Sequence, residues 1–136
     1  MTTEKVCPVV LRRKGGRIEV LAFRHPTAGF QLVKGDVEPG EDPIDAARRE
    51  LAEESGITTI SSIEPKGVWE SGYDGQVWHF YLCAVEEDLP ESWIFFANDG
   101  GGQNFNFFWF RMGDDFGEEW HPVFVRALAY IEVNIL

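Results

Sequence analysis

The chain has 136 residues, the size of one domain with its own core, and we expect a single domain over residues 1–136. Hydrophobic residues make up 44% of the chain and charged residues 26%, a balance that excludes general disorder. The formal net charge of −11 repels a phosphate backbone and argues against binding of duplex nucleic acid. No apolar run approaches the roughly 18 residues of a membrane span and the start lacks a signal peptide, so we expect no membrane partner and a cytoplasmic location.

The first segments in chain order predict a β-hairpin. Residues 6–13 and 17–25 are rich in apolar and β-branched side chains and are joined by Lys14-Gly15-Gly16. A turn over residues 26–29 leads into a short strand over residues 30–33. A loop rich in glycine and proline then follows over residues 35–41.

The spacing of the next residues predicts a helix over residues 43–55. Asp42 suits the N-cap and Pro43 the first helical position, where no backbone N–H is needed. Ile44, Ala47 and Leu51 recur at helical spacing and form one apolar stripe. Because a C-terminal glycine can adopt a left-handed conformation, Gly56 predicts the end of this helix.

The second half of the chain predicts three further strands and a second helix. The expected strands are residues 68–70, 76–85 and 105–112, and the helix begins at Pro122. Residues 86–104 are expected to form a long connection. The order β-β-β-α-β-β-β-α predicts an α/β (α+β) fold, a mixed sheet with helices packed on it, without the regular alternation of a Rossmann fold.

The sequence around the two cysteines favours buried thiols over metal ligands or nucleophiles. Cys7 and Cys83 each lie in an apolar, strand-like run, without CxxC spacing or a nearby histidine. We therefore expect two reduced thiols and no disulfide.

Three glutamates in the first helix contradict the electrostatics of a stable helix. Glu50, Glu53 and Glu54 project from one face, where like charges destabilise by a few tenths of a kcal/mol per pair. The last two also lie near the negative end of the helix dipole, which disfavours acids by roughly 0.3–1 kcal/mol each. A solvated acidic face is one interpretation. The other is a site for a divalent cation, because hard cations such as Mg²⁺ bind carboxylate oxygens.

The residues around this helix favour the cation site. Gly35 permits close approach of the backbone to a ligand, and Glu41 can accept backbone N–H bonds and fix the loop. Arg49 can hold Glu50 in one rotamer through its planar guanidinium, and Lys34 adds a cation. The alternatives are a surface ion pair for Arg49 and an exposed strand end for Lys34.

The segment GDVEPGEDPIDAARRELAEESGI, residues 35–57, resembles the Nudix box G-x5-E-x7-R-E-U-x-E-E-x-G-U, in which U is a bulky aliphatic residue. Every fixed position is filled, by Gly35, Glu41, Arg49, Glu50, Glu53, Glu54 and Gly56, and the aliphatic positions by Leu51 and Ile57. The resemblance implies a Nudix-like mixed β-sheet sandwiched between helices.

The resemblance also implies an activity, the hydrolysis of a nucleoside diphosphate linked to another moiety, with Mg²⁺ or Mn²⁺ as cofactor. It implies a nucleotide-type small molecule as substrate and, since family members are often dimers, a homodimer. The implied site residues are the metal ligands Glu50, Glu53, Glu54 and the Gly35 carbonyl, with Arg49 orienting Glu50 and Glu41 steadying the loop.

One departure from the family pattern affects the catalytic base. Many relatives carry a further glutamate six residues before a tryptophan, and if Trp109 is that tryptophan, the position holds Gln103. A neutral amide cannot act as a general base, so we place Gln103 among the substrate-binding residues. Glu50, Asp99, Glu118 or Glu119 remain as candidate bases. The alternatives are a catalytically weak, nucleotide-binding regulatory module and an acidic protein-interaction domain.

The substrate is less clearly encoded. Residues 30–35 resemble the W-x-x-P-K-G segment of Nudix enzymes that act on nucleoside and dinucleoside polyphosphates, with Val33 in place of proline. Lys34 and Arg24 are predicted to contact phosphates, although Arg24 equally suits a solvated surface. Four aromatic residues could stack on a base or belong to the core: Tyr73, Trp93, Phe95 and Phe96.

Overall fold

The computed structural model describes residues 2–98 and 100–136. The elements, in chain order, are β1 Thr3–Val9, β2 Leu11–Lys14, β3 Arg17–His25, β4 Gly29–Gln31, β5 Gly35–Asp36, α1 Pro43–Ser55, β6 Ile60–Glu70, β7 Gln76–Val85, β8 Trp93–Ala97, β9 Gln103–Arg111 and α2 Pro122–Asn134.

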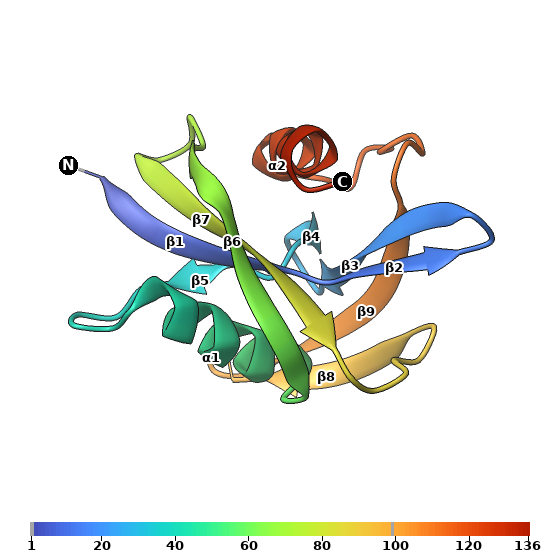
Figure 1. Ribbon diagram of the computed structural model, residues 1–136, viewed down its shortest axis with the longest axis horizontal. Coiled ribbons are helices and arrows are strands. Elements are labelled where there is room, and N and C mark those ends of the chain that lie inside the picture. The colour runs from blue at the N-terminus through green and yellow to red at the C-terminus, as the bar shows by residue number, and fades with distance from the viewer. Residues whose placement is uncertain (1, 99) are drawn as a thin grey trace.

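The strands form two sheets that lie between the helices (Figure 1). One sheet has the order β5-β1-β7-β6, and it is mixed, because β1 and β7 run parallel while their outer neighbours are antiparallel. The other has the order β2-β3-β9-β8, with β4 paired to β3, and it is antiparallel. The expected α+β fold with a mixed sheet is confirmed.

The two helices cover opposite sides of the strands (Figure 1). The buried stripe of α1, which contains Ala47 and Leu51, packs in one core cluster with Phe23 and Phe105. Side chains of α2 form a second cluster with Trp78 and others of both sheets. The sheets therefore lie between the two helices, as expected, and each helix packs on its own hydrophobic cluster.

Helix α1 has the predicted bounds and the predicted caps. The Asp42 side chain accepts a hydrogen bond from the Ile44 N–H at 3.2 Å, and Pro43 occupies the first turn. Gly56 ends the helix with φ of 81°, a left-handed conformation that favours glycine. These caps fix where the helix face with the three glutamates begins and ends.

The first predicted strand, residues 6–13, is wrong as a single element. It is divided at Val10, which is buried and accepts a hydrogen bond from the Leu21 N–H at 2.9 Å. Before Val10 the chain pairs with β7, and after it with β3. The chain thus passes from one sheet to the other at this residue, so only the second half of the run forms the predicted hairpin.

Two further predictions differ from the structure. The expected connection over residues 86–104 contains β8, which pairs with β9 at Phe95↔Phe105. The strand expected over residues 68–70 is the end of the longer β6, whose register shifts twice along β7. Gln103 also belongs to a strand and not to a loop, because it begins β9 and pairs with Ala97.

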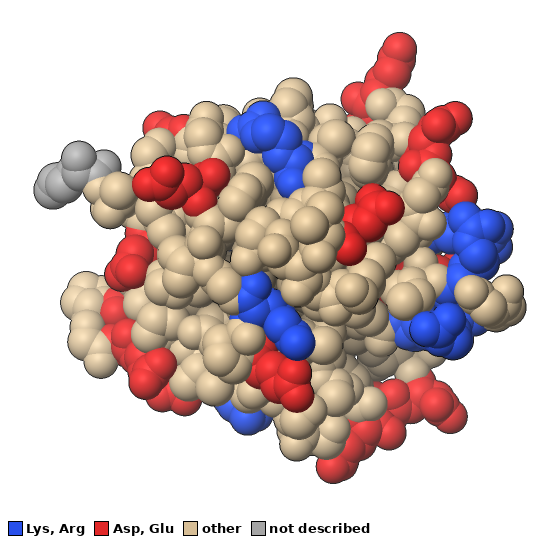
Figure 2. Space-filling model, turned by 45° about the horizontal axis from the view of Figure 1, so that its top comes forward, with Lys and Arg blue, Asp and Glu red and all other residues tan. Residues whose placement is uncertain are grey.

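Both cysteines are buried and free, as predicted. Burial raises the pKa of both thiols, that of Cys83 to about 12. Among residues 2–98 and 100–136, neither helix has the length and apolar character that crossing a bilayer requires. Acidic side chains are spread widely over the face in Figure 2, whereas basic ones form smaller groups.

Candidate active site

The three glutamates of α1 line one cavity of about 620 Å³. Glu50, Glu53 and Glu54 contribute to its wall from the helix, and Gly35 contributes from β5. Lys34, which precedes Gly35, also lines it. Residues of one sequence motif that lie on two different elements, β5 and α1, therefore line the same cavity.

Arg49 connects the helix to the loop that precedes it. Its Nε and one terminal nitrogen each donate to a Glu41 carboxylate oxygen at 2.9 Å, which is a bidentate pair. The other terminal nitrogen donates to Glu50 Oε1 at 2.8 Å and to Glu53 Oε2 at 3.1 Å. A fifth contact, at 2.8 Å, reaches the Asp36 carbonyl oxygen. Such planar donors orient carboxylates more strictly than an ammonium does.

Glu41 fixes the loop from its other side. Its Oε1 also accepts a hydrogen bond from the Glu38 N–H at 3.0 Å. The Arg49 guanidinium, and then this backbone donor, hold the pKa of Glu41 at about 2. The hydrogen bond to Glu41 likewise raises the pKa of Arg49 above its ordinary value. Both groups are therefore charged at neutral pH, and the loop over residues 36–41 is tied to α1.

Gly35 leaves the space that Glu50 occupies. A Cβ atom at this position would lie 1.9 Å from Glu50 Cδ and 2.1 Å and 2.3 Å from its two carboxylate oxygens. Any side chain there would have to displace the carboxylate. The glycine is thus required by the close approach of Glu50 to the backbone of β5, and not by its own dihedral angles.

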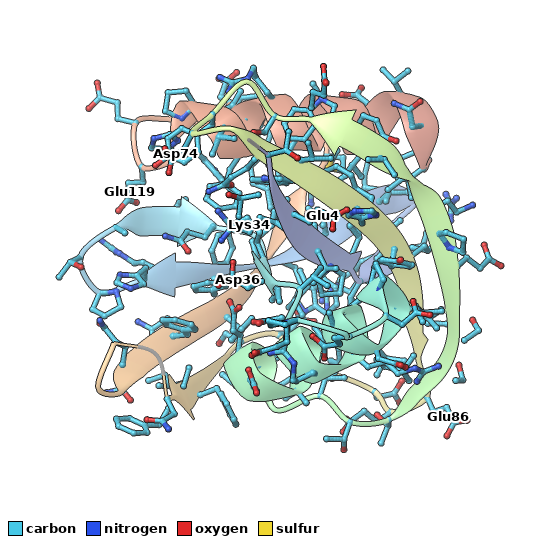
Figure 3. The ribbon with its side chains drawn as sticks, turned by 90° about the vertical axis from the view of Figure 1, so that its left-hand side faces the viewer. Glu4, Lys34, Asp36, Asp74, Glu86 and Glu119 are labelled. Carbon is cyan, nitrogen blue, oxygen red and sulfur yellow. The ribbon has the colours of Figure 1, made fainter. Side chains whose placement is uncertain are left out.

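Lys34 is held in place from several sides at the cavity. Its Nζ donates to Gln76 Oε1 at 3.2 Å and lies 5.1 Å and 5.7 Å from the ring centroids of Trp78 and Phe124. Burial lowers its pKa, and the charge of Lys5 lowers it further. Figure 3 shows Lys34 beside Asp36, between the layers of α1 and α2. The exposed strand end considered above is therefore wrong for this residue.

Lys5 also lines the cavity, and the sequence analysis missed it. It lies on β1 directly opposite Asp36 of β5, and the two side chains form an ion pair. The pairing of these strands brings Lys5 to a motif that begins 30 residues later in the chain. The only sequence signal was a lysine at the start of an apolar strand, and that signal does not distinguish it from a solubilising residue.

Two predicted substrate contacts are not among the described residues that line this cavity. Arg24 is exposed and pairs with Glu119 at 2.8 Å, and its guanidinium carbon lies 6.0 Å from the Phe30 ring centroid. Gln103 lies at the start of β9. Of the candidate bases, Asp99 lies outside the described residues, and Glu118 and Glu119 are exposed. The structure therefore brings Lys34 but not Arg24 to the glutamates.

The donor set has the chemistry that a hard divalent cation requires. Three carboxylates line the cavity, and Gly35 lies against the carboxylate of Glu50. Oxygen ligands of this kind suit Mg²⁺ and Mn²⁺. As the described side chains stand, no three His, Cys, Asp or Glu residues form a group that could hold a metal ion. Arg49 instead binds Glu50 and Glu53, so a cation would compete with it for these carboxylates.

The cavity is lined by carboxylates of a capped helix and by the glycine loop that Arg49 holds against that helix. A comparison of the chain with known families agrees with these features. A family model described as the NUDIX domain matches residues 2–127. The chain belongs to the Nudix family.

The chain is similar to proteins named as enzymes and to proteins whose structures have been solved. RNA pyrophosphohydrolase of Rhodopseudomonas palustris is 31% identical over 117 residues, which cover 76% of this chain and 64% of that protein. RNA pyrophosphohydrolase of Bartonella henselae is 48% identical over 91 residues, covering 57% and 53%. The chain thus spans roughly half to two thirds of these relatives' length. A C. elegans Ap4A hydrolase structure matches with a TM-score of 0.62 and 22% identity over 97% of this chain and 96% of that one, which shows the shared fold.

Proposed function

We propose that the protein hydrolyses a pyrophosphate bond in a nucleoside diphosphate linked to another moiety, with Mg²⁺ or Mn²⁺ as cofactor. Nucleoside and dinucleoside polyphosphates are the first substrates to test. The observation that carries the proposal is the single cavity lined by Glu50, Glu53, Glu54, Gly35 and Lys34. The names of similar proteins, RNA pyrophosphohydrolase and Ap4A hydrolase, support the same class of reaction.

The carboxylates of Glu50, Glu53 and Glu54, with the Gly35 carbonyl, would hold the cation. When bound there, the cation would neutralise phosphate charge and supply an activated water. Arg49 orients Glu50 and Glu53 by direct hydrogen bonds, and Glu41 in turn orients Arg49. A chain with a net charge of −11 repels an anionic substrate, so cations at the cavity are required for its entry.

The lysines of the cavity are proposed to contact the phosphates. Lys34 is the stronger candidate, because Gln76 and two aromatic rings hold its ammonium at the cavity wall. Lys5 is placed to add a second positive charge, since its charge is close enough to lower the pKa of Lys34. Arg24 stays a prediction, as do the homodimer, the single domain and the cytoplasmic location.

Glu50 is the candidate base that the geometry favours among those described. It lines the cavity, and its carboxylate lies against the Gly35 backbone and accepts from Arg49 at 2.8 Å. Such fixed geometry is what proton transfer to a positioned base requires. Glu118 and Glu119 lie in the exposed segment before α2, and Glu119 is occupied by Arg24.

The test of this function is turnover on a panel of nucleoside triphosphates, dinucleoside polyphosphates, ADP-ribose and other nucleotide sugars. The nucleotide products are separated and quantified by anion-exchange chromatography with Mg²⁺, then Mn²⁺, then with EDTA. We expect turnover of one class that disappears with EDTA and returns with the metal. No product from any class, with the fold intact and nucleotide binding measurable, would contradict hydrolysis.

We expect Gly35→Ala to lower kcat/KM by about 100-fold while the protein stays folded. The new Cβ would lie 1.9 Å from Glu50 Cδ, so the carboxylate must move, and a misplacement of about 1 Å can cost that much activity. Because the displaced group is the end of a flexible side chain, the midpoint of thermal unfolding should fall by only a few degrees. Gly15→Ala, in the β2–β3 turn, is the control. Equal activity losses in both variants would refute the steric argument.

The second candidate function is a catalytically weak nucleotide-binding module, which the neutral Gln103 favours. The Gln103→Glu variant separates the two candidates. Since Gln103 is not among the described residues that line the cavity, we expect kcat to change by less than about threefold. A gain of tenfold or more would instead indicate that a missing acid limits turnover, and would support the weak module.

A further inference from the structure

Part of the cavity wall is aromatic. Phe95 and Phe96 of β8 and Phe105 of β9 line the same space as the glutamates of α1. Phe105 is buried in the core, where its ring stacks on Phe23 with centroids 4.3 Å apart. Phe95 is half-buried, and its ring lies over Gly56, where a Cβ would meet it at 2.6 Å. Both rings therefore serve packing.

Phe96 differs, because it is 64% exposed and still lines the cavity. Side chains alternate along β8, so Trp93 and Phe95 pack inward while Ile94 and Phe96 point out of the core. Gly102 supports the ring from below. A Cβ at Gly102 would lie 2.4 Å from Phe96 Cζ and 2.9 Å from Cε2. The ring thus lies directly on the backbone at Gly102, and Phe96 as a residue stays largely exposed.

The other aromatic residues that the sequence left open have structural partners. The Trp93 ring stacks on Phe107 with centroids 5.0 Å apart, and its Nε1 donates to the Ser55 carbonyl oxygen at 3.1 Å. Tyr73 is not among the described residues that line the cavity, and its ring contacts His121 with centroids 4.9 Å apart. Of the four, Phe96 alone combines a cavity position with an open ring surface in the described residues.

We propose that Phe96 is a stacking platform for the nucleobase of the substrate. The inference rests on the proposed hydrolysis and names its substrate class, a nucleoside polyphosphate as opposed to an inorganic polyphosphate. The lysines are proposed to contact the phosphates, and the carboxylates to hold the cation that neutralises them. A flat, uncharged ring instead suits a nucleobase. A cavity of about 620 Å³ has the size of a small-molecule site. Asn98, exposed at the same wall, offers an amide donor and acceptor for the base edge.

The test compares Phe96→Ala with Ile94→Ala. Ile94 is 68% exposed on the same face of β8 but is not among the described residues that line the cavity, so it is a matched control. Calorimetry with Mg²⁺ measures the binding of α,β-methylene-ATP and of inorganic tripolyphosphate, which has no base. We expect Phe96→Ala to raise the Kd of the nucleotide about 5- to 100-fold and to leave that of tripolyphosphate unchanged. Phe96→Trp should retain nucleotide binding.

The outcomes separate this inference from the proposed hydrolysis. Equal nucleotide affinity in the wild type, Phe96→Ala and Ile94→Ala overturns the platform, even where the turnover panel supports hydrolysis. Loss of affinity for both probes in Phe96→Ala overturns it too, because a base platform cannot affect a ligand without a base. A selective loss of nucleotide affinity supports the platform even when no substrate is turned over. Absence of nucleotide binding by the wild type overturns the platform, while the turnover panel decides the proposed hydrolysis independently.

Discussion

Replacing Glu54 by glutamine is expected to lower kcat by at least about 100-fold on whichever substrate the panel identifies. The substitution keeps the shape of the side chain but removes one negative charge from the cavity wall, where Glu54 is proposed to bind the cation. Because ground-state packing is unchanged, circular dichroism and the thermal midpoint should stay close to those of the wild type. Relief of like-charge repulsion with Glu50, four residues away on the helix, offsets the lost attraction to Lys34, whose pKa the charge of Glu54 raises.

Glu86→Gln is the matched control for this loss of one negative charge. Glu86 is exposed after β7, and Figure 3 shows it far from Lys34 and Asp36. Calorimetric titration with Mn²⁺ gives a second readout, since Glu54→Gln should weaken metal binding and Glu86→Gln should not. Wild-type turnover and wild-type metal affinity in Glu54→Gln would refute the assigned role.

The second large effect is expected from Arg49→Lys, which keeps the charge but removes the planar set of donors. One ammonium cannot contact Glu41 bidentately and reach Glu50, Glu53 and the Asp36 carbonyl at the same time. Activity should fall about 10- to 100-fold, the usual cost of losing a group that orients metal ligands. The free energy of unfolding should fall by about 1 to 2 kcal/mol, since the contacts are charged but partly screened by solvent.

The pH dependence of stability tests the same contact. The hydrogen bonds from Arg49, and then from the Glu38 N–H, lower the pKa of Glu41 from 4.5 to about 2, so the folded state favours the ionised carboxylate. The stabilisation is therefore fully present above pH 4.5 and is lost as the pH falls toward 2. The wild type loses this stabilisation as the pH falls. The difference in unfolding free energy between the wild type and Arg49→Lys should therefore become smaller between pH 4.5 and pH 2.

Arg48→Lys is the control for the Arg49 variant, because Arg48 is the exposed neighbour on the same helix. Urea titrations of the three proteins at several pH values measure the free energies. If Arg48→Lys destabilised the protein as much as Arg49→Lys, the loss would reflect helix propensity. The network around Glu41 would then have no special role.

The first helix could be predicted to the residue because its signals are local. Asp42, Pro43 and Gly56 act within one turn of the helix ends, and the structure contains each of these caps. The motif residues on this helix share one face for the same reason, since helical spacing alone decides which side chains are neighbours. What could be predicted of the site is therefore the part that one helix and its preceding loop supply.

The missed strands depend on pairing partners that are distant in sequence. Residues of β6 are half-buried at about every third position and exposed between, without the alternation that identifies a strand, and Pro65 and Gly67 lie at its register shift. Residues 93–97 are a short apolar run that becomes β8 only through pairing with β9. The division at Val10 likewise follows from tertiary pairing, because the apolar pattern continues unbroken through it.

The cavity residues that the sequence did not assign come from such non-local pairings. Lys5 reaches the motif through the contact of β1 with β5, and Phe96 reaches it through the turn between β8 and β9. Neither residue carries a local signal that separates it from ordinary lysines and phenylalanines. Arg24, whose contact with phosphates stays a prediction, lies on β3 and pairs with Glu119 at the surface.

The separate origin of the cavity walls has an evolutionary consequence. The carboxylates come from a continuous stretch of 23 residues, 35–57, whereas the aromatic part comes from β8 and β9, more than 30 residues later. The two stretches do touch, through the hydrogen bond from Trp93 to the Ser55 carbonyl oxygen and the packing of Phe95 on Gly56. The exposed residues Phe96 and Asn98 take no part in these two contacts. Gene duplicates of this protein could therefore diverge in the molecules they accept by changing the exposed cavity residues Phe96 and Asn98, while inheriting the helix of glutamates unaltered.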